Sequence, residues 1–252
     1  MRRLMTGTTV AMLVALVLVT AVFAGTYRSP DKDTTCDTGS TCYNGYGVYI
    51  ESSGSPAGGC YPTYVGYIGW NLSSENRTWQ SAVLKLWAYD TAGGGPTYTF
   101  TLYPANSDNW TEDGTDPGYD SNTVLASASV DLSSVSQSNM VELSFSSNEL
   151  GDYFLNKRGQ EATLAVVMTD GCGGVSGSVW FEDKDGTGGS APQSGKEPDL
   201  IFYTGQNATS VSLSSMNAGD TTSTNWTLIA GLVALVLVAV AGVGLGVRRL
   251  NS

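Results

Sequence analysis

The sequence of 252 residues contains no histidine. This absence excludes Ser-His-Asp and Cys-His catalysis. The sequence also lacks a C-x-x-C pair, so a zinc site is not expected. No glycine-rich phosphate loop joins a strand to a helix, since the GGG at 93–95 fits a hairpin turn. The side chains left for chemistry are carboxylates, amides and aromatic rings.

Basic residues are scarce. The chain has 12 lysines and arginines against 23 acidic residues, a formal net charge of −11. Residues 25–225 contain all 23 acids but only 8 of the basic residues, so this part carries a formal charge of −15. Nucleic acid is excluded as a partner, because its affinity comes from lysine and arginine contacts to phosphates. The acidic balance fits solubility in a salty or cation-rich exterior, or attraction to cations.

The N-terminal residues 1–24 are typical of a secretory signal peptide. Arg2 and Arg3 precede an apolar run, and Val22 and Ala24 fit the small-residue rule for cleavage after Ala24. An uncleaved N-terminal anchor is the alternative. The following residues 25–35 are polar, and we expect a loose segment there.

The C-terminal part predicts a membrane anchor. Residues 228–247 form an uncharged apolar run long enough to cross a bilayer as a helix. Two arginines follow it, which predicts a single-pass type I protein of the cell membrane with residues 226–252 as anchor and short basic cytoplasmic tail. Gly242 and Gly246 have the small-xxx-small spacing, which suggests weak self-association. Residues 205–225 are rich in serine and threonine and fit a stalk.

The region between, residues 36–204, is long enough for one domain. It contains segments in which apolar and polar residues alternate, the pattern of half-buried strands. Nine segments are candidate strands, and several of them alternate cleanly: 46–51, 63–72, 81–90, 97–104, 123–131, 140–146, 161–169, 177–182 and 199–204. One short helix is expected at 147–157, capped by Ser147 or Asn148. The pattern predicts an all-β domain, an antiparallel β-sandwich of the jelly-roll type.

Four cysteines lie in the exported part. An even number in an oxidising compartment predicts two disulfides, with all three pairings open. The candidates are Cys36, Cys42, Cys60 and Cys172.

Two acidic segments are candidate calcium loops, and calcium is the one cofactor that the sequence suggests. In NWTEDGTDPGYD, residues 109–120, Asn109, Asp113 and Asp120 have part of the spacing of a calcium-binding loop, with Gly114 at the sharp turn. In EDKDGTGG, Asp183 and Asp185 precede a glycine in the same way. A plain solvated loop is the alternative for both.

The first segment is also a candidate glycan site. Exposed aromatic rings stack on sugar rings while carboxylates bond the hydroxyls, which singles out Trp110, Glu112 and Tyr119. Trp110 could equally anchor the loop. Glu112 and Glu182 are the pair to test for glycoside hydrolysis, although we expect no enzyme. Trp87 and Trp180 lie mid-strand and are assigned to the core or a sheet face.

The sequence resembles the DNRLRE-type domains, also called disaggregatase-related domains or family-96 carbohydrate-binding modules, over roughly residues 45–204. The matching positions are Asn71-Leu72-Ser73, Ser81-Ala82, Trp110 with Glu112, Phe181, Pro198 to Leu200, and Tyr203. The resemblance implies a jelly-roll module that binds polysaccharide on secreted and surface proteins, often with calcium. The arginine that the family carries before Asn71 is absent here.

Together these observations predict a membrane-anchored cell-surface protein whose β-sandwich ectodomain binds polysaccharide. The alternative is a structural or adhesive envelope protein without a dedicated glycan site.

Overall fold

The computed structural model describes residues 25–43, 48–54, 59–172, 174, 176–185 and 195–203. The predicted signal peptide, stalk and anchor lie outside these residues. Within the described part, no helix is long and apolar enough to span a bilayer.

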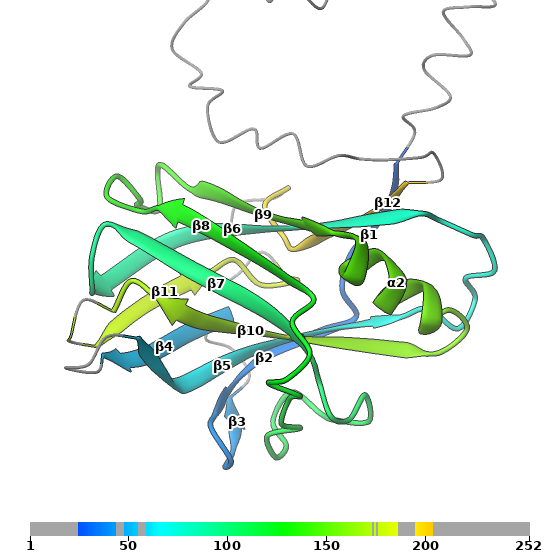
Figure 1. The fold of residues 1–252 in the computed structure, drawn as a ribbon, viewed down its shortest axis with the longest axis horizontal. Helices are drawn as coiled ribbons and strands as arrows, with labels where there is room; N and C mark the ends of the chain where they lie inside the picture. The colour runs from blue at the N-terminus through cyan, green and yellow to red at the C-terminus, as the bar shows by residue number, and fades with distance from the viewer. Residues whose placement is uncertain are drawn as a thin grey trace, which may run out of the picture. The chain divides into compact units, whose positions relative to one another are not determined.

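The described residues form a curled antiparallel sheet of 12 strands and one helix (Figure 1). Each of the nine predicted segments overlaps a strand. The strands are β1 (Thr26–Arg28), β2 (Lys32–Asp37), β3 (Cys42–Tyr43), β4 (Val48–Gly54), β5 (Cys60–Asn71), β6 (Ser81–Gly93), β7 (Thr97–Pro104), β8 (Ala126–Asp131), β9 (Val141–Ser147), β10 (Glu161–Asp170), β11 (Gly177–Phe181) and β12 (Asp199–Tyr203).

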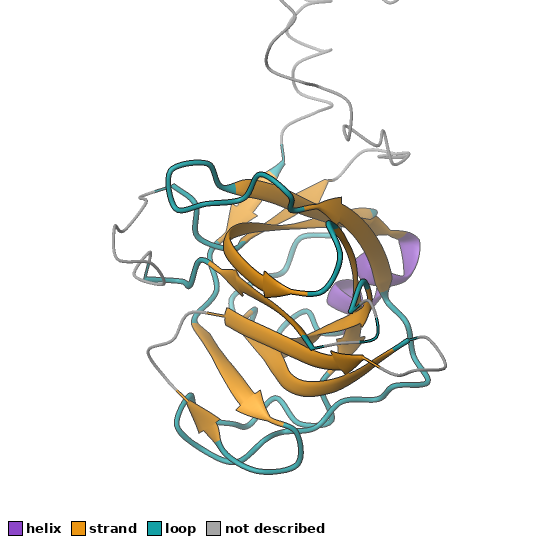
Figure 2. Cartoon of the chain, turned by 90° about the vertical axis from the view of Figure 1, so that its left-hand side faces the viewer, coloured by secondary structure: helices purple, strands orange, loops and turns teal. Residues whose placement is uncertain are grey.

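Neighbouring strands in the main path follow the order β1-β12-β6-β11-β4-β5-β10-β7-β8. Strand β9 pairs with β6, and β2 pairs with both β3 and β5. Figure 2 shows the strands curling around the interior, with the helix to one side. Because the side chains of a strand alternate between its faces, β6 buries Leu84 and Leu86 in the core, whereas Lys85 and Trp87 are only partly buried.

Helix α2 (Asn148–Asn156) lies where the sequence predicts it, and Ser147 is its N-cap. The Ser147 hydroxyl accepts a hydrogen bond from the backbone N–H of Leu150 at 2.9 Å, which satisfies one of the free donors of the first turn. Phe154 is fully buried and packs edge-on against Trp70, with ring centroids 5.4 Å apart. The helix therefore contributes its apolar face to the core.

The expectation of a loose segment at residues 25–35 is wrong. Thr26–Arg28 forms β1 on the edge of β12, and Lys32–Asp37 forms β2 along β5. Short polar strands give little periodic signal, yet their backbone groups satisfy the open edges of β12 and β5.

The prediction of two disulfides is confirmed. Cys36 bonds to Cys42 and joins β2 to β3. Cys60 bonds to Cys172. This disulfide links the start of β5 to the chain two residues after the end of β10. No cysteine of the described residues is free.

Candidate functional site

Trp110 is an anchor of the acidic loop. Its side chain is buried, and its ring Nε1 donates to the hydroxyl of Thr163 on β10 at 2.9 Å. The ring packs against Tyr67, and the Nζ of Lys32 lies 4.8 Å from its centroid. The loop-anchor interpretation thus fits this residue, and its ring has no free face for a sugar.

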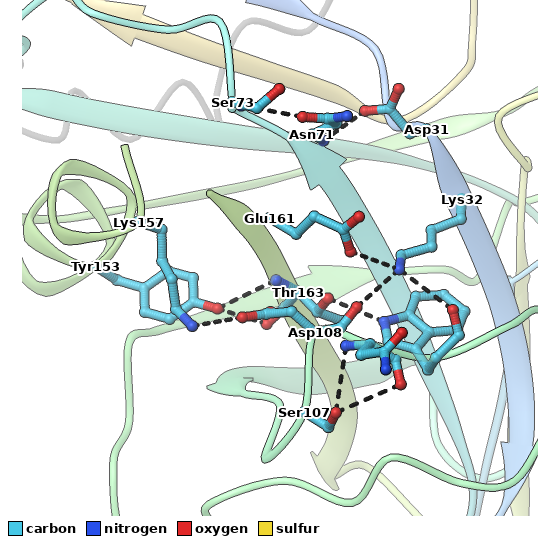
Figure 3. A network of polar contacts seen from close by, with 12 residues as sticks. Asp31, Lys32, Asn71, Ser73, Ser107, Asp108, Tyr153, Lys157, Glu161 and Thr163 are labelled. Atoms are coloured by element: carbon cyan, nitrogen blue, oxygen red, sulfur yellow. Dashed lines mark hydrogen bonds and ion pairs between the residues drawn. The ribbon is translucent and has the colours of Figure 1, made fainter. Parts of the chain in front are cut away.

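Lys32 holds the start of the same loop to the sheet (Figure 3). Its Nζ donates to the carbonyl of Asp108 at 2.8 Å and to the carboxylate of Glu161 at 2.9 Å. The Asp108 carboxylate accepts from Lys157 at 2.5 Å. The loop is therefore fixed from β2, β10 and the end of α2.

Glu112 contacts two other segments of the chain. Its carboxylate accepts from the backbone N–H of Asp33 at 3.0 Å and forms an ion pair with Lys184 at 3.3 Å. Its carbonyl accepts from the Thr34 hydroxyl at 2.6 Å. Glu182, the other half of the predicted acid pair, is fully buried. Glu112 thus ties the loop to β2 and to the segment after β11.

Asp33 is a buried carboxyl of this cluster with a raised pKa. It is 6% exposed, and its carboxylate accepts from the backbone N–H of Lys184 at 2.5 Å. Burial raises the pKa of Asp33 to about 7, and the nearby negative charges of Asp183 and Glu112 act in the same direction. The group titrates near neutral pH as a result.

The predicted calcium ligands do not form one group. Asp120 accepts from the Asn122 backbone N–H at 3.0 Å and the Thr123 hydroxyl at 2.6 Å, so it closes its own turn. Asp183 is buried and accepts from the Asp185 backbone N–H at 3.1 Å. The other three predicted ligands are exposed: Asn109, Asp113 and Asp185. The Asp185 carboxylate forms an ion pair with Lys184 at 2.7 Å. Within the described ranges, no cluster of three or more histidine, cysteine or acidic residues is arranged to hold a metal ion. Calcium binding stays a prediction.

Tyr119, the third predicted glycan-binding residue, packs against another tyrosine. Its ring lies 5.2 Å from that of Tyr103, against the small core cluster that contains Trp110. Burial raises the pKa of Tyr119. Of the three predicted residues, two are thus packing residues of the loop and the third is an ion-pair partner.

A different set of aromatic side chains forms a contiguous, partly exposed row on the sheet. Four rings follow one another across β3, β5, β4 and β11, and we call them the aromatic row: Tyr43, Tyr64, Tyr49 and Trp180. Successive ring centroids are 6.4, 5.3 and 4.7 Å apart. Tyr43 is 40% exposed, and the other three rings are partly exposed. Each step between rings is comparable to the length of one pyranose residue.

Strand register explains why the rings meet. Trp180 of β11 lies directly opposite Tyr49 of β4, and Glu51 of β4 lies opposite Tyr64 of β5. Directly opposed residues project to the same face, as do residues two apart on one strand. Tyr49, Glu51, Tyr64 and Trp180 therefore share a face, and the buried Val48 and Ile50 of β4 point away from it into the core.

Carboxylates accompany the aromatic row. The Tyr49 hydroxyl donates to the carboxylate of Glu51, Asp37 lies opposite Tyr64, and Asp90 lies opposite Trp180. Partial burial raises the pKa of Tyr64, and the charges near it, with Asp37 first among them, raise it further. Hydrogen-bond acceptors thus lie beside the rings.

Trp87 differs from the rings of the aromatic row, because a lysine side chain lies over its face. The Lys196 Nζ lies 3.2 Å from the centroid of the Trp87 ring and covers that face. Among the described residues, no lysine or arginine lies in this way over a ring of the aromatic row.

Sequence reasoning missed the aromatic row, and it assigned Trp180 to the core or a sheet face. The sequence signal for the row lies in GVYIE and GSVWFE, where Tyr49 and Trp180 alternate with apolar residues that pack in the core. An aromatic residue on the face opposite a strand's apolar set marks a surface ring.

No family model matches the chain, and no curated protein matches it. Among solved structures, the fold is similar to a xylan-binding module, CBM15, with a TM-score of 0.36 and 9% sequence identity over 73% of this chain and 100% of that module.

Proposed function

We propose that this chain is a membrane-anchored surface protein whose β-domain binds polysaccharide through the aromatic row, without cleaving it. The observation that carries the proposal is the contiguity of four partly exposed aromatic rings on four strands. The largest exposed apolar patches of soluble proteins often mark binding sites.

The chemistry of the row suits a sugar chain. The faces of pyranose rings carry C–H groups that pack on aromatic rings, while their hydroxyls need hydrogen-bond partners. Tyrosine supplies both a ring and a hydroxyl at a small cost in side-chain entropy. The carboxylates of Glu51 and Asp37 supply acceptors at the rim.

The surroundings of Glu112 and Glu182, the predicted acid pair, favour binding without hydrolysis. Glu112 is engaged by Lys184 and the Asp33 backbone, and Glu182 is buried away from solvent. A glycosidase needs an acid and a second carboxylate that both reach the scissile bond.

The proposal retains the jelly-roll description of the curled sheet and the kinship with DNRLRE-type domains. It also retains a type I anchor at residues 228–247, which would present the domain on the outside of the cell. Calcium belongs to the proposal as a stabiliser of the acidic loops rather than as a ligand of the sugar.

A binding experiment tests the proposal on the full chain in detergent. Polysaccharide pull-down and a glycan array would be compared for the wild type, Tyr49→Ala and Trp180→Ala. Loss of one anchoring ring should weaken binding about tenfold or more, roughly 1.4 kcal/mol.

Tyr27→Ala is the matched control, because Tyr27 is a 64% exposed tyrosine on β1, outside the aromatic row. It should bind like the wild type. Unchanged binding by a folded Tyr49→Ala/Trp180→Ala double variant would refute the role of the aromatic row. Failure of the wild type to bind any polysaccharide would refute the function and favour an adhesive or structural role.

A further inference from the structure

The charge along the aromatic row points to a class of glycan. Three carboxylates lie beside the rings: Asp37 and Glu51 flank Tyr64 from its two neighbouring strands, and Asp90 lies opposite Trp180. They lie at two places along the row, two carboxylates beside Tyr64 and one beside Trp180. A bound chain that follows the rings therefore passes all three.

These carboxylates are not neutralised by neighbouring side chains. Within the ranges that the structure describes, no ion pair involves Asp37, Glu51 or Asp90. The basic residue that follows β11, Lys184, is engaged with Glu112 and Asp185. The row thus presents negative charge to its ligand.

Resting on the proposed function, we infer that the aromatic row selects polysaccharides that carry protonated amino groups, such as partly deacetylated β-linked hexosamines, and rejects polyuronates and sulfated glycans. The rings bind the sugar faces irrespective of charge. The carboxylates discriminate, because specificity is a difference of affinities and a like charge beside the ligand opposes binding.

The size of the selectivity follows from surface ion pairs. One exposed carboxylate paired with one ammonium group changes an equilibrium by about two- to fivefold. Three such contacts along the row give a preference of about tenfold or more for a glucosamine hexasaccharide over its N-acetylated form. The preference should fall when salt rises from about 0.01 M to about 1 M, because the screening length shrinks from about 30 Å to about 3 Å.

The experiment is a titration of the full chain in detergent with three probes: a β-1,4-glucosamine hexasaccharide, the same oligosaccharide fully N-acetylated, and an oligogalacturonate. We expect the order amino, then acetylated, then uronate. The variant Asp37→Asn/Glu51→Gln/Asp90→Asn keeps the shape of each side chain and removes its charge. It should bring the first two affinities within about threefold of each other.

The results separate the specificity from the function. Equal affinity of the wild type for the amino and acetylated probes, or tighter binding of the uronate, would overturn the inference, while loss of that binding in Trp180→Ala would leave the proposed function standing. No binding of any probe or array polysaccharide would overturn both. If the triple variant does not fold, Glu51→Gln replaces it and should lower the amino-probe affinity about two- to fivefold. If Glu51→Gln binds the amino probe as tightly as the wild type does, and the wild-type affinity does not depend on salt, the inference is refuted.

Discussion

Replacing Asp33 with asparagine should stabilise the protein at pH 8 and leave its stability unchanged in acid. The Asp33 side chain is almost fully buried beside Asp183 and Glu112, and burial raises its pKa from 3.8 to about 7. Asparagine has nearly the same shape, stays neutral, and can still accept the hydrogen bond from the Lys184 backbone N–H with its amide oxygen.

The sign follows from proton linkage. The folded state binds the Asp33 proton more tightly than the unfolded state does. The stabilisation that this proton gives the folded state is therefore complete below about pH 3.8 and is lost as pH rises through about 7. A rise of this size corresponds to about 4 kcal/mol of preference for the protonated carboxyl. Relaxation around the ionised group lowers that figure, and we expect a gain of at least about 1 kcal/mol for the variant at pH 8.

Urea unfolding of wild type and Asp33→Asn at a series of pH values from about 3.5 to about 8 measures the difference. The two free energies of unfolding should coincide at the acid end and separate between about pH 4 and 7. Asp131→Asn is the control, since Asp131 is exposed and hydrogen bonds from Ser133 lower its pKa. That variant should gain nothing at pH 8. A gap between wild type and Asp33→Asn that does not change with pH, or a less stable variant at pH 8, would refute the reasoning.

Three further substitutions test the packing of the domain. Removing the Cys60–Cys172 disulfide with Cys60→Ala/Cys172→Ala should lower the free energy of unfolding by about 5 kcal/mol, and removing the Cys36–Cys42 disulfide with Cys36→Ala/Cys42→Ala by about 2 kcal/mol. The first loss is larger because a disulfide restricts the unfolded chain more when it closes a longer loop, and the two sequence separations are 112 and 6 residues. Denaturant unfolding of the two double variants measures both losses. Equal losses of free energy of unfolding would refute the loop-length argument. Ser147→Ala should cost about 1 kcal/mol through the lost helix cap, measured by thermal unfolding; no loss would mean that the cap is redundant. Trp110→Phe should cost about 1–3 kcal/mol, because the buried Thr163 hydroxyl loses its donor; a stability equal to wild type would show that water replaces the indole.

The strands and the helix were predictable because their signals are local. In β6, alternation alone places Leu84 and Leu86 inward and Lys85 and Trp87 outward, and the structure agrees. The helix at 148–156 follows from a serine cap and an apolar face. β1 and β2 were not found, because a short polar strand depends on an open edge elsewhere in the chain for its pairing.

The aromatic row depends on distant pairing in the same way. Tyr49 and Trp180 are far apart in the sequence, and only the β4–β11 register brings them into contact. Alternation shows that both project away from the apolar side of their strands, but it does not show which strands are neighbours. Disulfide pairing was open for the same reason.

The two tryptophans show how context determines the role of a side chain. Trp110 lies in an acidic loop, where a sugar contact is an attractive interpretation, yet a loop that crosses a sheet needs an apolar anchor, and Trp110 supplies it with a hydrogen bond to β10. Trp180 lies in a strand, where core packing is the simplest interpretation, yet its strand already buries Val179 and Phe181 on the other face. Because one face of an antiparallel strand fills the core, a large ring on its other face must pack against its cross-strand neighbours, meet a ligand, or both. Trp180 packs against Tyr49 and remains partly exposed, so it keeps surface available for a ligand.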